Sequence, residues 1–161
     1  ADGIDMLDAI FVQVGGGAFA ASMSRGLREG GVSAPLIAVQ TEGCAPLARA
    51  FASALADDRA AAHWSNHMWP WEATPTSLAD GILDDETYDW VADVDEMRRT
   101  GGRGVVADED IVVSAATLGP ELSGIDASPT GTSGLAGLMS TAHSLPSDAN
   151  VALVFSGVRR G

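Results

Sequence analysis

Short apolar runs alternate along the chain with longer segments in which apolar residues recur at helical spacing. The run at 9–14 is short, mostly apolar and rich in β-branched residues, and it ends at three consecutive glycines, which predicts a buried parallel strand followed by a tight turn. In the next segment, 18–29, Phe19, Met23 and Leu27 recur every four positions. That spacing predicts a helix with one apolar face that packs back on the strand. The chain therefore opens with a strand, a glycine turn and a helix.

The same alternation continues to the end of the chain. Further strands are predicted at 36–40, 104–107 and 151–155, and further helices at 45–55, 108–118 and 135–143. Strands that are separated by helices pair in parallel through right-handed crossovers. At 161 residues the chain has the length of one ordinary domain. The sequence thus predicts a single α/β domain over 1–161, a three-layer α/β/α sandwich with a mostly parallel sheet.

Two segments lack a steady period. Residues 63–75 hold three of the four tryptophans, two histidines and two prolines, and this mixture predicts an ordered loop. Residues 84–96 are acidic with apolar residues interspersed. We interpret that acidic segment as a solvated face or edge rather than as an ion or partner site.

Charge and composition exclude several classes of function. The formal net charge is −13, so the surface repels phosphate backbones and anionic membranes, which argues against a nucleic-acid or membrane partner. The longest apolar runs are far shorter than the roughly 20 residues of a transmembrane helix. The single cysteine, Cys44, forms no internal disulfide, which favours a cytoplasmic location. All nine basic residues are arginine, and the chain has no lysine.

The three glycines between a buried strand and a helix have a specific physical use. Without side chains, the backbone approaches an anion closely and directs several N–H groups toward it, and the expected ligand is a phosphate. A tight turn that needs positive φ explains the glycines equally well. A Walker loop needs a lysine, and the dinucleotide fingerprint needs a glycine where Ala20 stands. ATPase and nicotinamide-dependent functions are therefore not expected.

Residues 11–22 resemble the phosphate-binding loop of the fold-type II pyridoxal-phosphate enzymes, the family of threonine synthase, threonine and serine dehydratases and the tryptophan synthase β chain. Four later segments agree with that family in order and spacing. They are the strand and turn at 37–43, the "S-x-A-D-G" segment at 77–82, the C-terminal cofactor motif at 128–131 and the last strand at 154–157. Residues 129–138 are most similar to those of threonine synthases.

The resemblance implies a cofactor, pyridoxal 5′-phosphate, and the residues that hold it. The cofactor phosphate is expected on the backbone N–H groups of Gly15, Gly16, Gly17, Ala18 and Phe19. Ala18 stands where many members have a fourth glycine, and its methyl group is tolerated only where φ is negative. Thr130 aligns with the hydroxyl residue that bonds the pyridine nitrogen, although it also suits an N-cap before the helix near residue 135.

The missing lysine decides what this chain does by itself. In the resembling family a lysine forms the Schiff base with the cofactor and lies before the glycine loop. We therefore expect this chain to be the C-terminal portion of such an enzyme, or one subunit of a split one, and incomplete relative to the family's full chain. It is expected to carry no catalytic residue and to be inactive alone. An N-terminal half or partner subunit is expected to supply the lysine, and the complete enzyme to be a homo-oligomer.

The implied function is that of a lyase or synthase acting on amino acids by β- or γ-elimination or replacement, most like threonine synthase. Two alternatives stay open. One is a threonine or serine dehydratase-like enzyme. The other is a noncatalytic phosphate- or pyridoxal-phosphate-binding regulatory domain that lacks the lysine half. Strands left without their usual neighbours are also expected to make the isolated chain associate or dissolve poorly.

The remaining candidate residues favour structural roles. His63 and His67 lack a third ligand at a usual spacing, so no metal site is expected. The tryptophans of the 63–75 segment suit core or interface packing better than a substrate pocket. Cys44 is expected to be a small buried residue rather than a reactive thiol.

Overall fold

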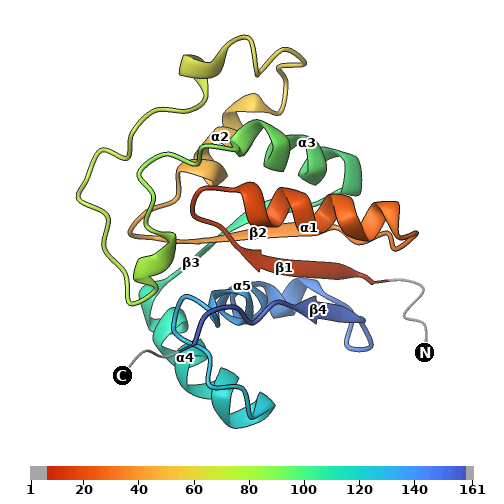
Figure 1. Ribbon diagram of the computed structural model, residues 1–161, viewed down its shortest axis with the longest axis vertical. Coiled ribbons are helices and arrows are strands. Elements are labelled where there is room, and N and C mark those ends of the chain that lie inside the picture. Colours follow the sequence, from red (N-terminus) through yellow and green to blue (C-terminus); the bar gives the residue numbers. More distant parts are fainter. Residues whose placement is uncertain (1–6, 159–161) are drawn as a thin grey trace.

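Four parallel strands form one sheet in the order β3-β2-β1-β4 (Figure 1). The computed structural model describes residues 7–158. The strands are β1 (Ala9–Gln13), β2 (Leu36–Thr41), β3 (Arg103–Ala107) and β4 (Val151–Leu153). Ile10 pairs with Leu36 on β2 and with Ala152 on β4, so β1 is an inner strand with a neighbour on each side.

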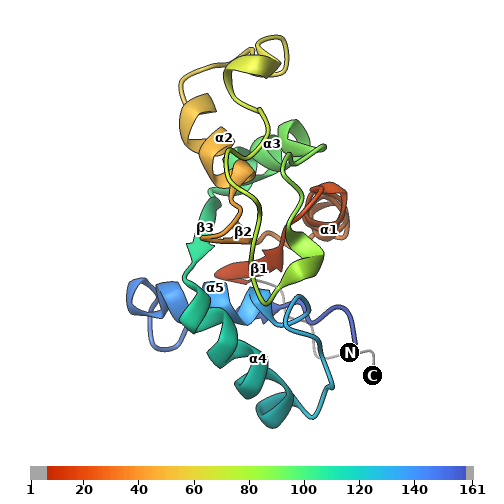
Figure 2. The same cartoon turned by 90° about the vertical axis from the view of Figure 1, so that its left-hand side faces the viewer.

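Helices cover both faces of the sheet, which gives the predicted three layers (Figure 2). On one face lie α1 (Ala18–Glu29), α2 (Pro46–Ala54) and α3 (Trp90–Thr100). On the other lie α4 (Glu109–Ser123) and α5 (Ser133–Thr141). In the described part of the chain, three 3₁₀ turns complete the elements: η1 (Trp64–Asn66), η2 (Asp80–Ile82) and η3 (Ala142–Ser144).

Successive side chains of the inner strand β1 enter two different cores. Ile10 and Val12 pack under α1–α3 with the fully buried Trp90, whereas Ala9 and Phe11 pack against α4 and α5. A strand that is buried on both faces reads as a continuous apolar run, and this explains why it was visible in the sequence.

Three predicted elements have bounds that differ by two residues or more in the structure. The helix expected at 135–143 is α5, which begins and ends two residues earlier. The helix expected to stop near Leu118 continues as α4 through Pro120 to Ser123 and is capped by Gly124, whose φ is 72°. The strand expected at 151–155 is only three residues long and half-buried, because β4 pairs with β1 alone and is an edge strand. Within residues 7–158, no helix is long and apolar enough to cross a membrane.

The acidic segment is a solvated face only in part, because Asp85, Asp89 and Asp95 are exposed whereas Asp93 and Glu96 are buried. Its second half is helix α3, which buries Trp90, Asp93, Val94 and Met97. These positions follow the i, i+3, i+4, i+7 spacing of a core-facing helix stripe. One member of that stripe is a carboxylic acid, and it lies directly beneath the glycine loop.

Candidate functional site

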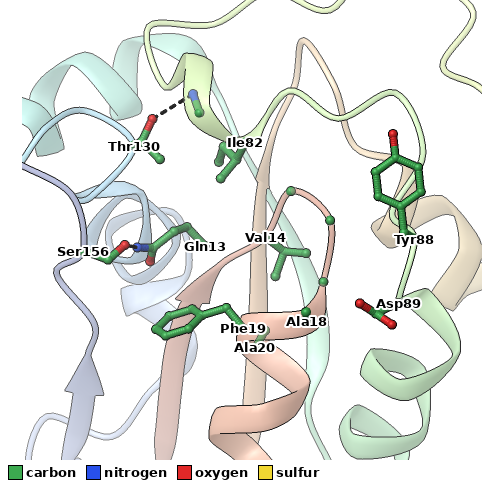
Figure 3. Close-up of a pocket in the computed structure, with 14 residues that line it drawn as sticks. Gln13, Val14, Ala18, Phe19, Ala20, Ile82, Tyr88, Asp89, Thr130 and Ser156 are labelled. Carbon is green, nitrogen blue, oxygen red and sulfur yellow. Dashed lines mark hydrogen bonds between the residues drawn. The ribbon is translucent and has the colours of Figure 1, made fainter.

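A cavity of about 440 Å³ lies where β1 ends and α1 begins (Figure 3). Carboxyl ends of parallel strands are the usual ligand sites of α/β folds. The structure brings all the predicted cofactor residues to this one cavity: Gly15, Gly16, Gly17, Ala18, Phe19 and Thr130. Further lining residues were not predicted, and these include Gln13, Gly81, Tyr88, Asp89 and Ser156.

Close packing fixes the glycine loop. Gly17 is the N-cap residue of α1 with φ 99°, and a Cβ there would lie 2.3 Å from Asp93 Oδ2. A Cβ on Gly15 would lie 2.5 Å from Asp84 Oδ2. The turn therefore needs glycine for its conformation at one position and for lack of space at two.

The loop leaves its backbone donors free. Within residues 7–158, the backbone N–H groups of residues 15–19 have no hydrogen-bond acceptor. The next N–H group along the chain, that of Ala20, donates to the Gly17 carbonyl. Asp89 N–H donates to the Gly16 carbonyl over 2.9 Å and holds the loop from outside. Free N–H groups at a helix N-terminus, together with the helix dipole, form a site for an anion. The turn and anion explanations of the three glycines are thus compatible.

Ala18 meets the condition set by its methyl group. In the described part of the chain every residue with positive φ is a glycine, so Ala18 has negative φ. Its side chain is exposed at the start of α1. The departure from the family's fourth glycine therefore leaves the loop conformation intact.

Thr130 lies in the loop between α4 and α5 and faces the cavity (Figure 3). Its Oγ1 accepts a hydrogen bond of 3.0 Å from the N–H of Gly81. Since a hydroxyl has one donor as well as two acceptor positions, its proton stays available for an acceptor on a ligand. The N-cap alternative for Thr130 was wrong, because Thr132 is the residue that precedes α5.

Gln13 and Ser156 form a polar pair at the other side of the cavity. Gln13 Nε2 donates to Ser156 Oγ, whereas Gln13 Oε1 is buried and has no hydrogen-bond partner within residues 7–158. A buried polar atom without a partner is uncommon and marks a place for a ligand or an ordered water. The sequence held a signal for this residue, because Gln13 is the one polar position in the apolar run at 9–14.

Acidic groups surround the loop. Asp89 lines the cavity, and Asp93 is fully buried below Gly17. Burial raises the pKa of Asp93 to about 8, the negative charge of Asp89 adds to this, and the Ala21 N–H opposes it. Among the described residues no arginine lines the cavity, so backbone dipoles provide the attraction for an anion there.

The two histidines have a structural role. Asp57 Oδ2 joins them, at 2.6 Å from His63 Nδ1 and 3.0 Å from His67 Nε2. Hydrogen bonds from His67, His63 and the Arg59 backbone hold the pKa of Asp57 below its usual range. No group of side chains in residues 7–158 has the arrangement of a metal site.

The tryptophans and the cysteine also lie away from the cavity. Trp64 packs edge-on against the buried Trp90 with ring centroids 5.3 Å apart, and the Arg49 guanidinium lies 3.9 Å from the ring centroid of Trp69. Cys44 is buried, and burial raises its pKa to about 11. The thiol donates to the Asp84 carbonyl, and its burial agrees with the expected small buried residue.

The profile of the pyridoxal-phosphate dependent enzyme family matches residues 2–157. The chain belongs to this family. A search of curated proteins found no match. Solved structures with the same fold include a threonine deaminase from T.th., at 21% identity and a TM-score of 0.72, and a maize serine racemase, at 18% and 0.67. A fungal L-serine ammonia-lyase from Rhizomucor miehei has 18% identity and a TM-score of 0.68.

These solved structures are about twice as long as this member of the pyridoxal-phosphate family. The three alignments cover 95%, 96% and 94% of this chain but only 50%, 44% and 46% of the other chains. At such identities the likeness shows the fold alone. The chain thus corresponds to about half of a complete family fold, in agreement with the incompleteness expected from the sequence.

The residues of this structure fit the family's cofactor. Free N–H groups at the start of α1 suit its phosphate, and the available proton of Thr130 suits its pyridine nitrogen. The loop and Thr130 border the same cavity, so one ligand can contact both. The assignment of individual residues to the cofactor remains a prediction.

Proposed function

We propose that this chain is the cofactor-holding portion of a pyridoxal-phosphate enzyme that acts on amino acids. The N–H groups of residues 15–19 would bind the phosphate, and Thr130 the pyridine nitrogen. The observation that carries this proposal is the convergence of unbonded backbone donors and one free hydroxyl proton on a single cavity, in a chain that belongs to the family.

Bound pyridoxal phosphate supplies an electron sink for negative charge that develops at the amino-acid Cα. Thr130 moderates that sink, because a neutral hydroxyl donates to the pyridine nitrogen without holding a proton on it as a carboxylate would. The Gly81 N–H occupies one acceptor position of the Thr130 oxygen and so orients the hydroxyl group. A moderate electron sink suits elimination and replacement at Cβ or Cγ.

The reactive lysine would come from outside this chain, either from another segment of the same protein or from a partner subunit. The 161 residues contain no lysine, and the chain spans about half the length of the solved structures. Within residues 7–158 the outer edge of β4 has no neighbouring strand, and Leu122 and Ile125 are 79% and 51% exposed beside a 620 Å³ groove. Such apolar surface supports association with the missing portion, and oligomer formation by the complete enzyme.

A threonine synthase-like reaction is the finer proposal, and it rests on the resemblance of residues 129–138 to threonine synthases. O-phosphohomoserine is the substrate this implies. A threonine or serine dehydratase-like reaction is the second candidate, since the similar solved structures include a threonine deaminase and an L-serine ammonia-lyase. The two reactions differ in the steps after the leaving group departs.

Product analysis with the full-length protein distinguishes these candidates. Phosphate release from O-phosphohomoserine with formation of threonine supports the synthase. Release of ammonia and a 2-oxo acid from threonine or serine supports the dehydratase. Tight binding of pyridoxal phosphate without turnover of any of these amino acids contradicts both and supports a regulatory binding domain.

Two variants at Thr130 test the site itself. Thr130→Val removes the hydroxyl at nearly constant shape, whereas Thr130→Ser keeps it. We expect pyridoxal phosphate to bind about tenfold more weakly to the valine variant, because one net hydrogen bond is lost, and nearly normally to the serine variant. Equal affinity of both variants and the unmodified protein would remove Thr130 from the site.

A further inference from the structure

Asp93 is the buried ionisable group closest to the proposed phosphate site. It lies in the first turn of α3 with none of its surface exposed. A Cβ on Gly17 would lie 2.3 Å from its Oδ2 and 3.0 Å from Thr87 Cγ2, so the carboxyl group packs directly against the loop backbone. The N-terminus of α1 begins at the same point, and its positive dipole end faces this carboxyl group and the cavity.

The surroundings of Asp93 disfavour a negative charge, because burial and the charge of Asp89 outweigh the opposing effect of the Ala21 N–H. Neither carboxylate oxygen has a hydrogen-bond partner of good geometry within residues 7–158. Asp89, the residue that precedes α3, carries a negative charge that repels an ionised Asp93. The cations of the other elements packed on α3 are engaged elsewhere: Arg25 with Glu29, Arg28 with Glu96, Arg49 with Glu72 and Arg103 with Ser144. Asp84 is also acidic and lies against Gly15.

We propose that the protonated, uncharged form of Asp93 is required for the glycine loop to bind a phosphate group. An ionised Asp93 would place a negative charge beneath the same N–H groups and oppose the helix dipole that attracts the anion. Phosphate binding and the protonation of Asp93 are therefore linked. A bound phosphate favours the protonated form of Asp93, and loss of that proton weakens the binding of the phosphate. Burial, which raises the pKa of Asp93 to about 8, keeps the site competent at neutral pH.

The inference rests on the proposed location of the cofactor phosphate, and its test compares two ligands. Pyridoxal 5′-phosphate carries the anion, whereas pyridoxal has the same ring without it. The dissociation constants of both ligands for the full-length protein are measured by absorbance from pH 6.5 to 9.5. The phosphate contribution is the ratio of the dissociation constant of pyridoxal to that of pyridoxal phosphate, in which the effect of the ring cancels. The phosphate ester is already a dianion over most of this range, because its second pKa is about 6.

For the unmodified protein, the phosphate contribution is expected to fall by about tenfold between pH 7 and pH 9, since one proton is lost from a group that must be protonated. In Asp93→Asn, which keeps the shape and removes the ionisation, the contribution is expected to stay constant within about twofold. Asp89→Asn removes an equal charge at the cavity wall. The pH dependence is expected to persist in that variant with a lower midpoint, because Asp89 no longer raises the pKa of Asp93.

The outcomes distinguish this inference from the proposed function. Equal pH profiles for Asp93→Asn and the unmodified protein, with pyridoxal phosphate still bound better than pyridoxal, would overturn the role of Asp93 alone. Absence of any preference for pyridoxal phosphate at pH 7 would overturn the location of the phosphate and with it the proposed function. Circular dichroism of each variant establishes that the fold is retained.

Discussion

The Gln40 side chain caps α2 from inside the protein, with Oε1 accepting the Leu47 N–H at 2.8 Å. The same oxygen accepts the Ala48 N–H at 3.1 Å, and Nε2 donates to the Val14 carbonyl, the residue before the glycine loop. Gln40 therefore connects the ends of β1 and β2 with the start of α2. Its amide is fully buried and bonded at both ends, which lets a polar residue lie in a core strand.

Replacing Gln40 with leucine is expected to lower the free energy of unfolding by about 2–4 kcal/mol. The variant keeps most of the volume but leaves two helix N–H groups and one carbonyl buried without partners, each at a cost of roughly 1–3 kcal/mol with partial relaxation. Urea denaturation of the full-length protein measures the change. Ser114→Ala, at an exposed hydroxyl of α4, is the control and is expected to stay within about 0.5 kcal/mol.

Asp93→Asn is expected to stabilise the protein at neutral and alkaline pH. The pKa of this carboxyl rises from 3.8 to about 8 on folding, so the native state binds more protons than the unfolded state between these values. Below about pH 4 Asp93 is protonated in both states and does not lower the free energy of unfolding. As pH rises from there toward 8, its preference to ionise in the unfolded state lowers the free energy of unfolding. Thermal melts at several pH values are expected to show a gap of a few kcal/mol in favour of the variant near pH 8 that closes near pH 4. A constant gap would mean that Asp93 does not ionise in this window.

Asp57→Asn is expected to loosen the segment that follows α2. Asp57 bonds both His63 and His67, and His67 Nδ1 is also 3.0 Å from Ser53 Oγ on α2. Because the pKa of Asp57 is lowered by folding, its stabilising effect is present above its ordinary pKa of 3.8 and is lost as pH falls through the lowered value. Melting temperatures at neutral pH are expected to be lower for the variant, and the difference to disappear in strong acid. The control is Asp58→Asn, which removes the same charge from the exposed neighbouring residue. It is expected to change the melting temperature little at neutral pH or in strong acid.

Much of the fold followed from local patterns. The run before Gly15 and the helix after Gly17 were predicted at nearly their observed bounds, because a strand buried on both faces and an amphipathic helix have different periods. Edge strand β4 was harder to bound, since its length depends on pairing with β1 alone. Helix α4 extends past Gly119 and Pro120, residues that predict a helix end when only neighbours in sequence are considered.

The candidate site was predicted only where its residues carry a motif. The glycine loop has a strand before it and a helix after it, and Thr130 belongs to a segment that resembles the family. Asp93 was missed because its neighbours in sequence are acidic and suggested a solvated surface, whereas its burial follows from the packing of α3 under α1. Gln13 and Ser156 are 143 positions apart in sequence and meet only in the folded chain.

The most direct test of the cofactor site is the dissociation constant of pyridoxal phosphate for full-length protein carrying Gly17→Ala, compared with Ala18→Gly. Alanine at 17 must adopt a φ near 99° and meets Asp93 Oδ2 at 2.3 Å, so the loop shifts and its N–H groups lose their convergence. We predict binding at least about tenfold weaker for Gly17→Ala, equivalent to one or more lost charge-assisted hydrogen bonds, and within about threefold of normal for Ala18→Gly. Unchanged affinity in a correctly folded Gly17→Ala protein would contradict a cofactor phosphate on this loop.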